Sequence, residues 1–182
     1  MKAPRVLALG VGNILMRDDG VGVHAVQVLA DAYELPQNIR VVDGGVAGLR
    51  LLADVADSDF LLIVDAVRNG GEPGSIYHLG PEHIQPRRGL FVSAHQVGIA
   101  ELLAAAEFSG RLPETQIIGV EPLDTDTVGL EISLPLRFAL PRVVAAIVDT
   151  LHAHGIELKE KPRAGMQPCE PEGVDARVID RP

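Results

Sequence analysis

Two carboxylates and one imidazole are the side chains of this sequence that could bind a metal ion together. Asp19 follows Asp18 in the loop after an apolar segment, Asp65 lies in the apolar run FLLIVDAV at 60–67, and His95 opens a segment with helical spacing. An unpaired carboxylate is costly to bury, so Asp65 needs a hydrogen-bond partner or a cation. Such a trio leaves coordination positions open and suits a borderline divalent ion such as nickel, zinc or iron(II).

Each of these residues also has a purely structural interpretation. Asp65 could cap the exposed amides of a turn or a helix N-terminus, and the His95 imidazole could bond a nearby carbonyl at the start of its helix. The three residues are far apart in the sequence, and no compact metal motif such as HExxH occurs. Spacing alone therefore leaves both interpretations open. We assign packing or surface roles to His24, His78, His152 and His154.

A glycine-rich turn is expected where the second strand ends, at Asp43-Gly44-Gly45. Its glycines allow a positive φ and a close backbone approach, which suits a turn beside a bound chain. An ordinary tight turn is the alternative.

A nucleotide site is a rival interpretation of the first loop. Gly10-Val11-Gly12 follows a predicted strand, and Asp43 ends the next one, as in a dinucleotide-binding fingerprint. However, Leu15 stands where the third glycine belongs, and the loop before the helix is too long to cup a pyrophosphate. We therefore rank this interpretation below the metal site.

The elements that position these residues alternate between strands and helices. Apolar runs predict strands at 5–9, 39–42, 60–67, 75–79 and 115–120, the fourth of them at an edge. Helical spacing predicts helices at 20–33, 47–56, 95–108 and 134–154, the last broken or kinked at Pro141. This order predicts a three-layer α/β fold, a mostly parallel sheet flanked by helices on both faces. Ligands of such sheets bind at the C-terminal ends of the strands.

Composition and charge limit the class of protein. Residues 1–158 are predicted to form one domain, and residues 159–182, which hold four of the 13 prolines, a disordered tail. A net charge of −9 disfavours nucleic acid and anionic membranes as partners. The lone Cys169 forms no internal disulfide, and no segment reads as a signal peptide or membrane span. We expect a cytoplasmic protein.

Five segments together resemble the hydrogenase maturation endopeptidases, which process the large subunits of nickel-iron hydrogenases. They occur in family order over about residues 5–157, and the first and fourth are specific in combination: GVGNILMRDDGVGVHAV at 10–26, VVDGGVAGLRLLADV at 41–55, LLIVDAV at 61–67, SAHQVGIAELLAAAEFSG at 93–110 and IIGVEP at 117–122. The resemblance implies a single α/β domain. It also implies that Asp19, Asp65 and His95 form the metal-binding trio, with Asp19 where some members have glutamate. Asp43 and its two glycines correspond to a turn that handles substrate.

The resemblance further implies an activity and a partner. The substrate would be a hydrogenase large-subunit precursor that brings its own nickel, and the enzyme would cleave its C-terminal extension once the nickel is in place. We hypothesise that Asp19 or Asp43 activates the attacking water. No Ser–His or Cys–His pair is evident for covalent catalysis. The alternatives are a nucleotide-binding α/β module and a nickel chaperone without hydrolytic activity.

Overall fold

One five-stranded sheet forms the centre of the molecule. The computed structural model describes residues 3–83 and 94–162, with the backbone alone for residues 94–97. The strand order is β3-β1-β4-β6-β5, in which the first four strands are parallel and β5 runs antiparallel along one edge. The strands are β1 (Val6–Val11), β3 (Ile39–Gly45), β4 (Phe60–Ala66), β5 (Ile76–Leu79) and β6 (Glu114–Val120). The predicted fold class and the edge position of the fourth strand are confirmed.

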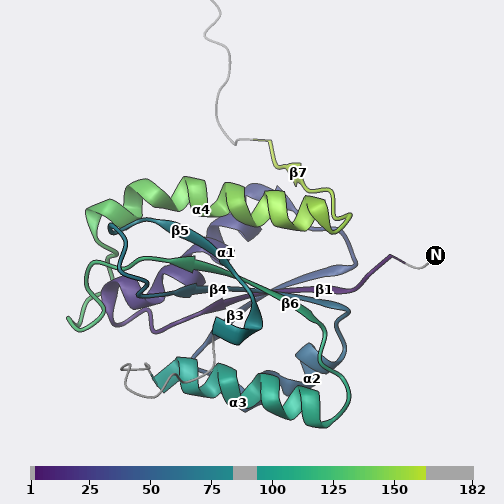
Figure 1. The fold of residues 1–182 in the computed structure, drawn as a ribbon. Helices are drawn as coiled ribbons and strands as arrows, with labels where there is room; N and C mark the ends of the chain where they lie inside the picture. Colours follow the sequence, from purple (N-terminus) through teal and green to yellow (C-terminus); the bar gives the residue numbers. More distant parts are fainter. Residues whose placement is uncertain (1–2, 84–93, 163–182) are drawn as a thin grey trace, which may run out of the picture.

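Helices cover both faces of this sheet (Figure 1). Helices α1 (Val21–Ala32) and α4 (Leu134–Ala153) pack on one face. On the other face lie α3 (Ala94–Phe108), the 3-10 turn η2 (Gly48–Leu51) and α2 (Leu52–Ala56). Successive strand residues point to opposite faces, so Leu62 and Val64 of β4 pack under α1 while Leu61 and Ile63 pack under α3. Both faces are thereby buried, which explains why β4 is apolar throughout except at Asp65.

Of the break or kink predicted at Pro141, the break does not occur. The helix continues without a break from Leu134 to Ala153, with Pro141 inside it. An internal proline costs roughly 3 kcal/mol in helix propensity. Apolar residues on both sides of it, including Ala139, Val143 and Ile147, are buried against the sheet. Their burial offsets the cost, so packing overrides the local preference.

Two boundaries also differ from the prediction. Strand β3 includes the Asp43-Gly44-Gly45 segment that was expected to follow it as a turn. A register shift at the end of β1 pairs Gly10 with Asp43 but Val11 with Gly45, so the strand continues through a bulge. At the other end of the chain, β7 (Lys159–Glu160) pairs antiparallel with β2 (Tyr33–Glu34). The folded part therefore extends past the boundary predicted at residue 158, whereas residues 163–182 lie outside the described residues.

Two further 3-10 turns are η1 (Arg17–Gly20) and η3 (Pro81–His83). Within the described residues, no helix has the length and apolar character needed to cross a bilayer.

Candidate functional site at the carboxyl edge of the sheet

Glycines pack the turn that carries Asp19 against the C-terminal ends of β1 and β4. Gly12 has a φ of +123°, and a Cβ there would lie 1.8 Å from the Asp19 carbonyl oxygen. A Cβ on Gly22, in the first turn of α1, would lie 2.1 Å from the carbonyl oxygen of Val64. Only glycine permits these approaches. The turn and the end of β4 are in contact as a result, so Asp19 and Asp65 occupy the same edge of the sheet.

The two adjacent carboxylates of this turn have different surroundings. Asp18 is fully buried and accepts three backbone hydrogen bonds, from Leu123 and Asp124 at 2.9 Å each and from Ser133 at 2.6 Å. Its oxygens are thus used to hold the segment between β6 and α4. Asp19 is 8% exposed, and its Oδ2 accepts the amide of Asn13 at 2.9 Å. Of the pair, Asp19 is the better candidate for chemistry, because the Asp18 oxygens are already occupied by three backbone amides.

Asp65 is the second-last residue of β4, and it pairs with Gly119 of β6 in the sheet register. It is 6% exposed. A Cβ on Gly119 would lie 3.0 Å from the Val67 side chain, so glycine lets the end of β4 and the residue after it pack closely against β6. The carboxylate is therefore buried at the sheet edge where α/β proteins bind ligands.

Asp43 and the start of α3 are brought to the same edge by a glycine contact. Gly48 of η2 and Gly98 of α3 face one another so closely that a Cβ on Gly98 would lie 3.3 Å from the Gly48 Cα. His95 lies three residues before Gly98 in the same helix, so its backbone is held beside the β3–η2 connection. Its side chain lies outside the described residues. Asp43 is exposed, and its Oδ2 lies 3.5 Å from the Nε2 of Gln27.

The predicted trio therefore remains a prediction. Among the side chains that the structure describes, no three His, Cys, Asp or Glu residues form a metal-binding group, and His95 is not among those side chains. The backbone nevertheless brings Asp19, Asp65 and the start of α3 to the C-terminal edge of the sheet. Two buried carboxylates there can bind a cation or, where water reaches them, accept a proton.

Glu121 is a buried carboxylate of the same edge that the sequence analysis did not single out. Its Oε2 accepts hydrogen bonds from the amides of Asn69 (2.8 Å) and Gly71 (3.3 Å) and from the hydroxyl of Tyr77 (2.8 Å). Burial works to raise the pKa of Glu121, but these hydrogen bonds outweigh it and the pKa is lowered. Glu121 thus fixes the loop after β4. The signal that could have revealed it is a glutamate at the end of a buried strand, as with Asp65.

The loop between β6 and α4 is bound to the Asp19 turn at several points. The Arg17 amide donates to the Gly129 carbonyl at 2.8 Å, and the Arg17 Nη1 pairs with the Asp124 Oδ2 at 3.1 Å. The Asp124 Oδ1 accepts the amides of Asp126 and Thr127, and hydrogen bonds from Thr127 hold its pKa below the usual range. Asp124 therefore holds this loop in place, whereas the Asp126 side chain is 93% exposed.

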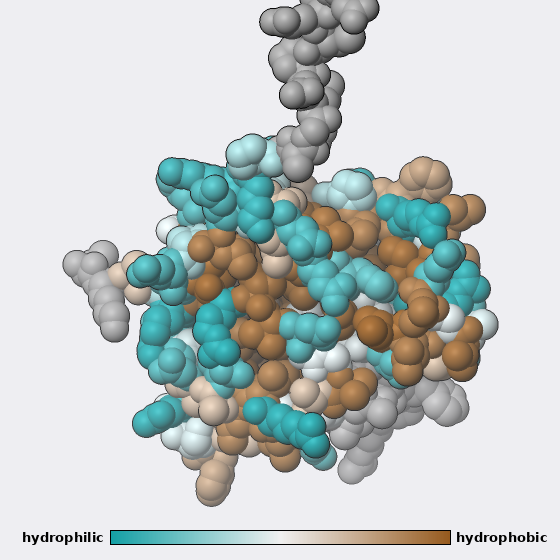
Figure 2. Space-filling model, turned by 180° about the vertical axis from the view of Figure 1, so that it is seen from behind, coloured by the Kyte–Doolittle hydropathy of each residue, from teal (hydrophilic) through white to brown (hydrophobic). Residues whose placement is uncertain are grey.

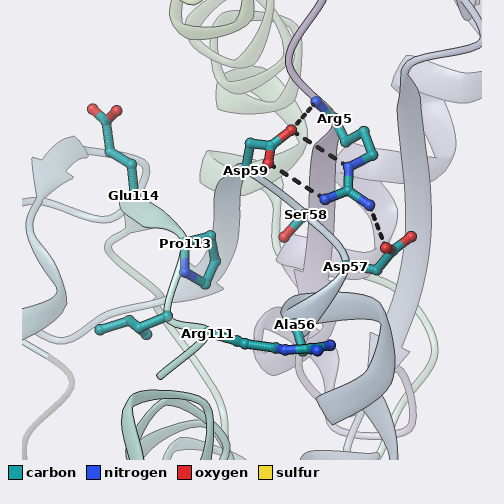
Figure 3. A pocket seen from close by; sticks show the side chains of 9 residues that line it. Arg5, Ala56, Asp57, Ser58, Asp59, Arg111, Pro113 and Glu114 are labelled. Carbon is teal, nitrogen blue, oxygen red and sulfur yellow. Dashed lines mark hydrogen bonds and ion pairs between the residues drawn. The ribbon is translucent and has the colours of Figure 1, made fainter. Parts of the chain in front are cut away.

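A shallow pocket of about 500 Å³ lies at the opposite edge, where the strands begin. Figure 3 shows the Arg5 guanidinium between Asp57 and Asp59, with which it forms ion pairs. The single guanidinium thus bridges two carboxylates at the start of β1 and β4. The pocket is therefore a charged surface groove beside the N-terminal ends of the strands. It is remote from the C-terminal edge.

His154 has the packing role expected from the sequence. Its ring stacks on Phe60 with centroids 3.7 Å apart, and its Nδ1 lies 2.8 Å from the Thr150 carbonyl oxygen.

The chain is similar in sequence and structure to several known proteins that share one description. A family model described as "Hydrogenase maturation protease" matches residues 23–150. The hydrogenase expression/formation protein HupD of Rhizobium leguminosarum bv. viciae is 38% identical over 182 aligned residues, covering 98% of this chain and 90% of the relative. The hydrogenase 2 maturation protease of Escherichia coli K12 is 38% identical over 151 residues, covering 80% of this chain and 92% of the relative.

Solved structures agree with these relatives. The hydrogenase maturating endopeptidase HybD from Escherichia coli superposes with a TM-score of 0.80 at 31% identity, over 86% of this chain and 98% of that one. The [NiFe] hydrogenase maturation protease HybD from Thermococcus kodakarensis has a TM-score of 0.64 at 28% identity, over 80% and 98% of the two chains.

Proposed function

Because the chain belongs to the hydrogenase maturation protease family, and is therefore a peptidase, we propose that it removes the C-terminal extension of a hydrogenase large-subunit precursor after nickel has been inserted. The observation that carries the proposal is the placement of two buried carboxylates, Asp19 and Asp65, on adjoining segments at the C-terminal edge of the sheet. Neither contributes to the apolar core, which consists of Val, Leu, Ile and Ala side chains and Phe60. Burial of a carboxylate is costly without hydrogen-bond donors or a cation beside it, and a cation bound at this edge could contact both side chains.

In this proposal nickel belongs to the substrate. Asp19, Asp65 and His95 are the side chains that would contact a nickel ion still held by the precursor, and the oxygen and nitrogen donors suit that ion. Affinity then depends on the metal being present, because a precursor without nickel offers these ligands nothing to bind. The enzyme thereby distinguishes a finished metal site from an unfinished one.

We assign the role of general base to Asp43, with Asp19 as the alternative. Asp43 is exposed at the bulge that ends β3, so both water and an extended peptide can reach it. It lies beside Gly44 and Gly45, of which Gly45 has a φ of +46°. A carboxylate beside a glycine bulge can lie close to a scissile peptide and take a proton from the attacking water.

The test is a processing assay on the purified precursor, loaded with nickel or left without it. Mass spectrometry of the large subunit should show loss of the C-terminal extension with the loaded precursor alone. Asp19→Asn, Asp65→Asn and His95→Ala should each stop processing while thermal unfolding stays close to that of the wild type. Asp149→Asn, an exposed carboxylate on α4, is the matched control and should process normally. Equal processing of the nickel-free precursor would contradict the proposal, and nickel binding without cleavage would indicate a chaperone.

A further inference from the structure

Large apolar side chains are exposed beside the Asp19 turn. They lie after the C-terminal ends of β1 and β6 and in the first turns of α4, and we call them the apolar rim: Leu15 (55% exposed), Val128 (80%), Leu130 (66%), Leu134 (62%) and Phe138 (78%). The left edge of Figure 1 carries these segments. In the reversed view of Figure 2, brown residues lie among teal ones along the right-hand edge.

A backbone hydrogen bond brings two segments of the rim together. The Gly129 amide donates to the Leu15 carbonyl at 2.9 Å, so Leu15 lies beside the segment that carries Val128 and Leu130. Leu134 and Phe138 are four residues apart in α4 and therefore share one face of that helix. The rim thus borders the turn that carries Asp19.

The apolar rim is held in place before any partner arrives. The buried carboxylate of Asp18 binds Leu123 and Asp124 at one end of the loop and Ser133 at the other. A surface fixed in this way loses little conformational entropy on binding, which favours affinity. Exposed leucine and phenylalanine side chains on a fixed backbone are what a docking surface requires.

The charged side chains around the rim form ion pairs, which leaves the rim itself close to neutral. Three basic residues pair with three acidic ones: Arg17 with Asp124 at 3.1 Å, Arg137 with Glu131 at 3.4 Å and Arg68 with Asp126 at 3.7 Å. These charges cancel, although the whole chain carries −9. A neutral, apolar surface with a paired polar border matches the anatomy of a protein–protein interface and disfavours a charged small ligand.

We propose that the apolar rim docks the folded body of the large-subunit precursor and thereby presents its C-terminal extension to the edge that carries Asp19 and Asp43. The inference rests on the proposed function, because that function requires a protein substrate at this edge. The partner surface is an apolar patch near the start of the extension. Docking through the rim gives binding energy that is separate from any contact with nickel.

The experiment compares two exposed phenylalanines at opposite edges of the molecule. Phe138 belongs to the rim, whereas Phe108, 96% exposed, ends α3 where β6 is about to begin. Full-length Phe138→Ala and Leu130→Ala should raise the KM for nickel-loaded precursor about tenfold with kcat nearly unchanged, as expected for loss of an interface anchor. Phe108→Ala should leave both constants at the wild-type values. Biolayer interferometry should show the same weakening in the Kd.

The outcomes separate the two proposals. If the wild type binds the precursor but does not cleave it, the proposed function fails while the docking surface can still be tested by Kd. If the wild type cleaves normally and the rim variants keep its KM and Kd, the docking inference is overturned. A concentration-dependent dimer that Phe138→Ala abolishes in light scattering would instead assign the rim to a second copy of this chain, and would also overturn it.

Discussion

The backbone amide of Ser133 donates a 2.6 Å hydrogen bond to the carboxylate of Asp18, across 115 residues of sequence. Ser133 is the residue before α4, and Asp18 lies in the turn before α1. One buried side chain thus links the starts of the two helices that cover the same face of the sheet. This link also fixes the backbone at the neighbouring Asp19.

Replacing Asp18 with alanine should destabilise the protein. Three backbone amides, of which that of Ser133 is buried, would lose a charged acceptor, which costs about 3 kcal/mol in the free energy of unfolding. Urea denaturation followed by circular dichroism measures this loss. Asp126→Ala, which removes a highly exposed carboxylate from the same loop, should change the free energy by less than about 0.5 kcal/mol. Similar losses for the two variants would contradict the assigned role of Asp18.

Gly22→Ala should be far more damaging than Gly110→Ala. A methyl group on Gly22 would overlap the carbonyl oxygens of Val64 and Val11, at 2.1 Å and 2.6 Å, so α1 would have to move away from the sheet. Gly110 has a φ of +67° but no neighbour within 4 Å of an added Cβ, so its replacement costs only about 1 kcal/mol of backbone strain. Thermal unfolding of both variants measures the contrast, and equal melting temperatures would rule out the close packing of α1.

Glu121 should make stability dependent on acid pH. Its pKa is lowered in the folded protein, so its contribution is present above the unfolded value near 4.5 and is lost as the pH falls through the depressed folded pKa. Glu121→Gln should therefore be less stable than the wild type at pH 7, and the difference should shrink below about pH 4. Urea titrations of both proteins at pH 7 and pH 3.5 test this. A difference that grows towards acid pH would have the wrong sign.

Asp43→Asn and Asp19→Asn should fail at different steps of the proposed reaction. Loss of the general base lowers kcat by about 10²-fold or more while nickel-loaded precursor still binds. Loss of a nickel contact weakens binding of the loaded precursor towards that of the nickel-free form. Binding measured by interferometry beside single-turnover cleavage distinguishes them. If Asp43→Asn cleaves at the wild-type rate, the base is Asp19, the alternative that the sequence left open.

The sequence predicted the sheet well because its strands are buried on both faces. The run at 60–67 is apolar except for Asp65, and the segment 115–120 ends in the apolar residues Ile117, Ile118 and Val120, so both segments indicate strands. The unbroken α4 was missed because the penalty of Pro141 is local, whereas the burial of Ala139 and Val143 is a tertiary effect.

The site was predictable only in outline. Position at strand ends identified Asp19, Asp43 and Asp65, and the structure brings all three to one edge of the sheet. The distinction between Asp18 and Asp19 depends on amides more than 100 residues away, as at Ser133 and Leu123, which no local pattern records. The roles of the trio, including His95, stay predictions for the experiments above.

The short ribbon of β2 and β7 determines where the chain can be tethered. The Lys161 amide bonds to the Ala32 carbonyl at 2.8 Å and its Nζ to that of Ala30, both in the last turn of α1, while Asp19 precedes the first turn of that helix. Twelve helical residues span roughly 18 Å. A chain shortened to end after β7 and tethered there would therefore be held a full helix away from the carboxyl edge, which would stay accessible to a bulky protein.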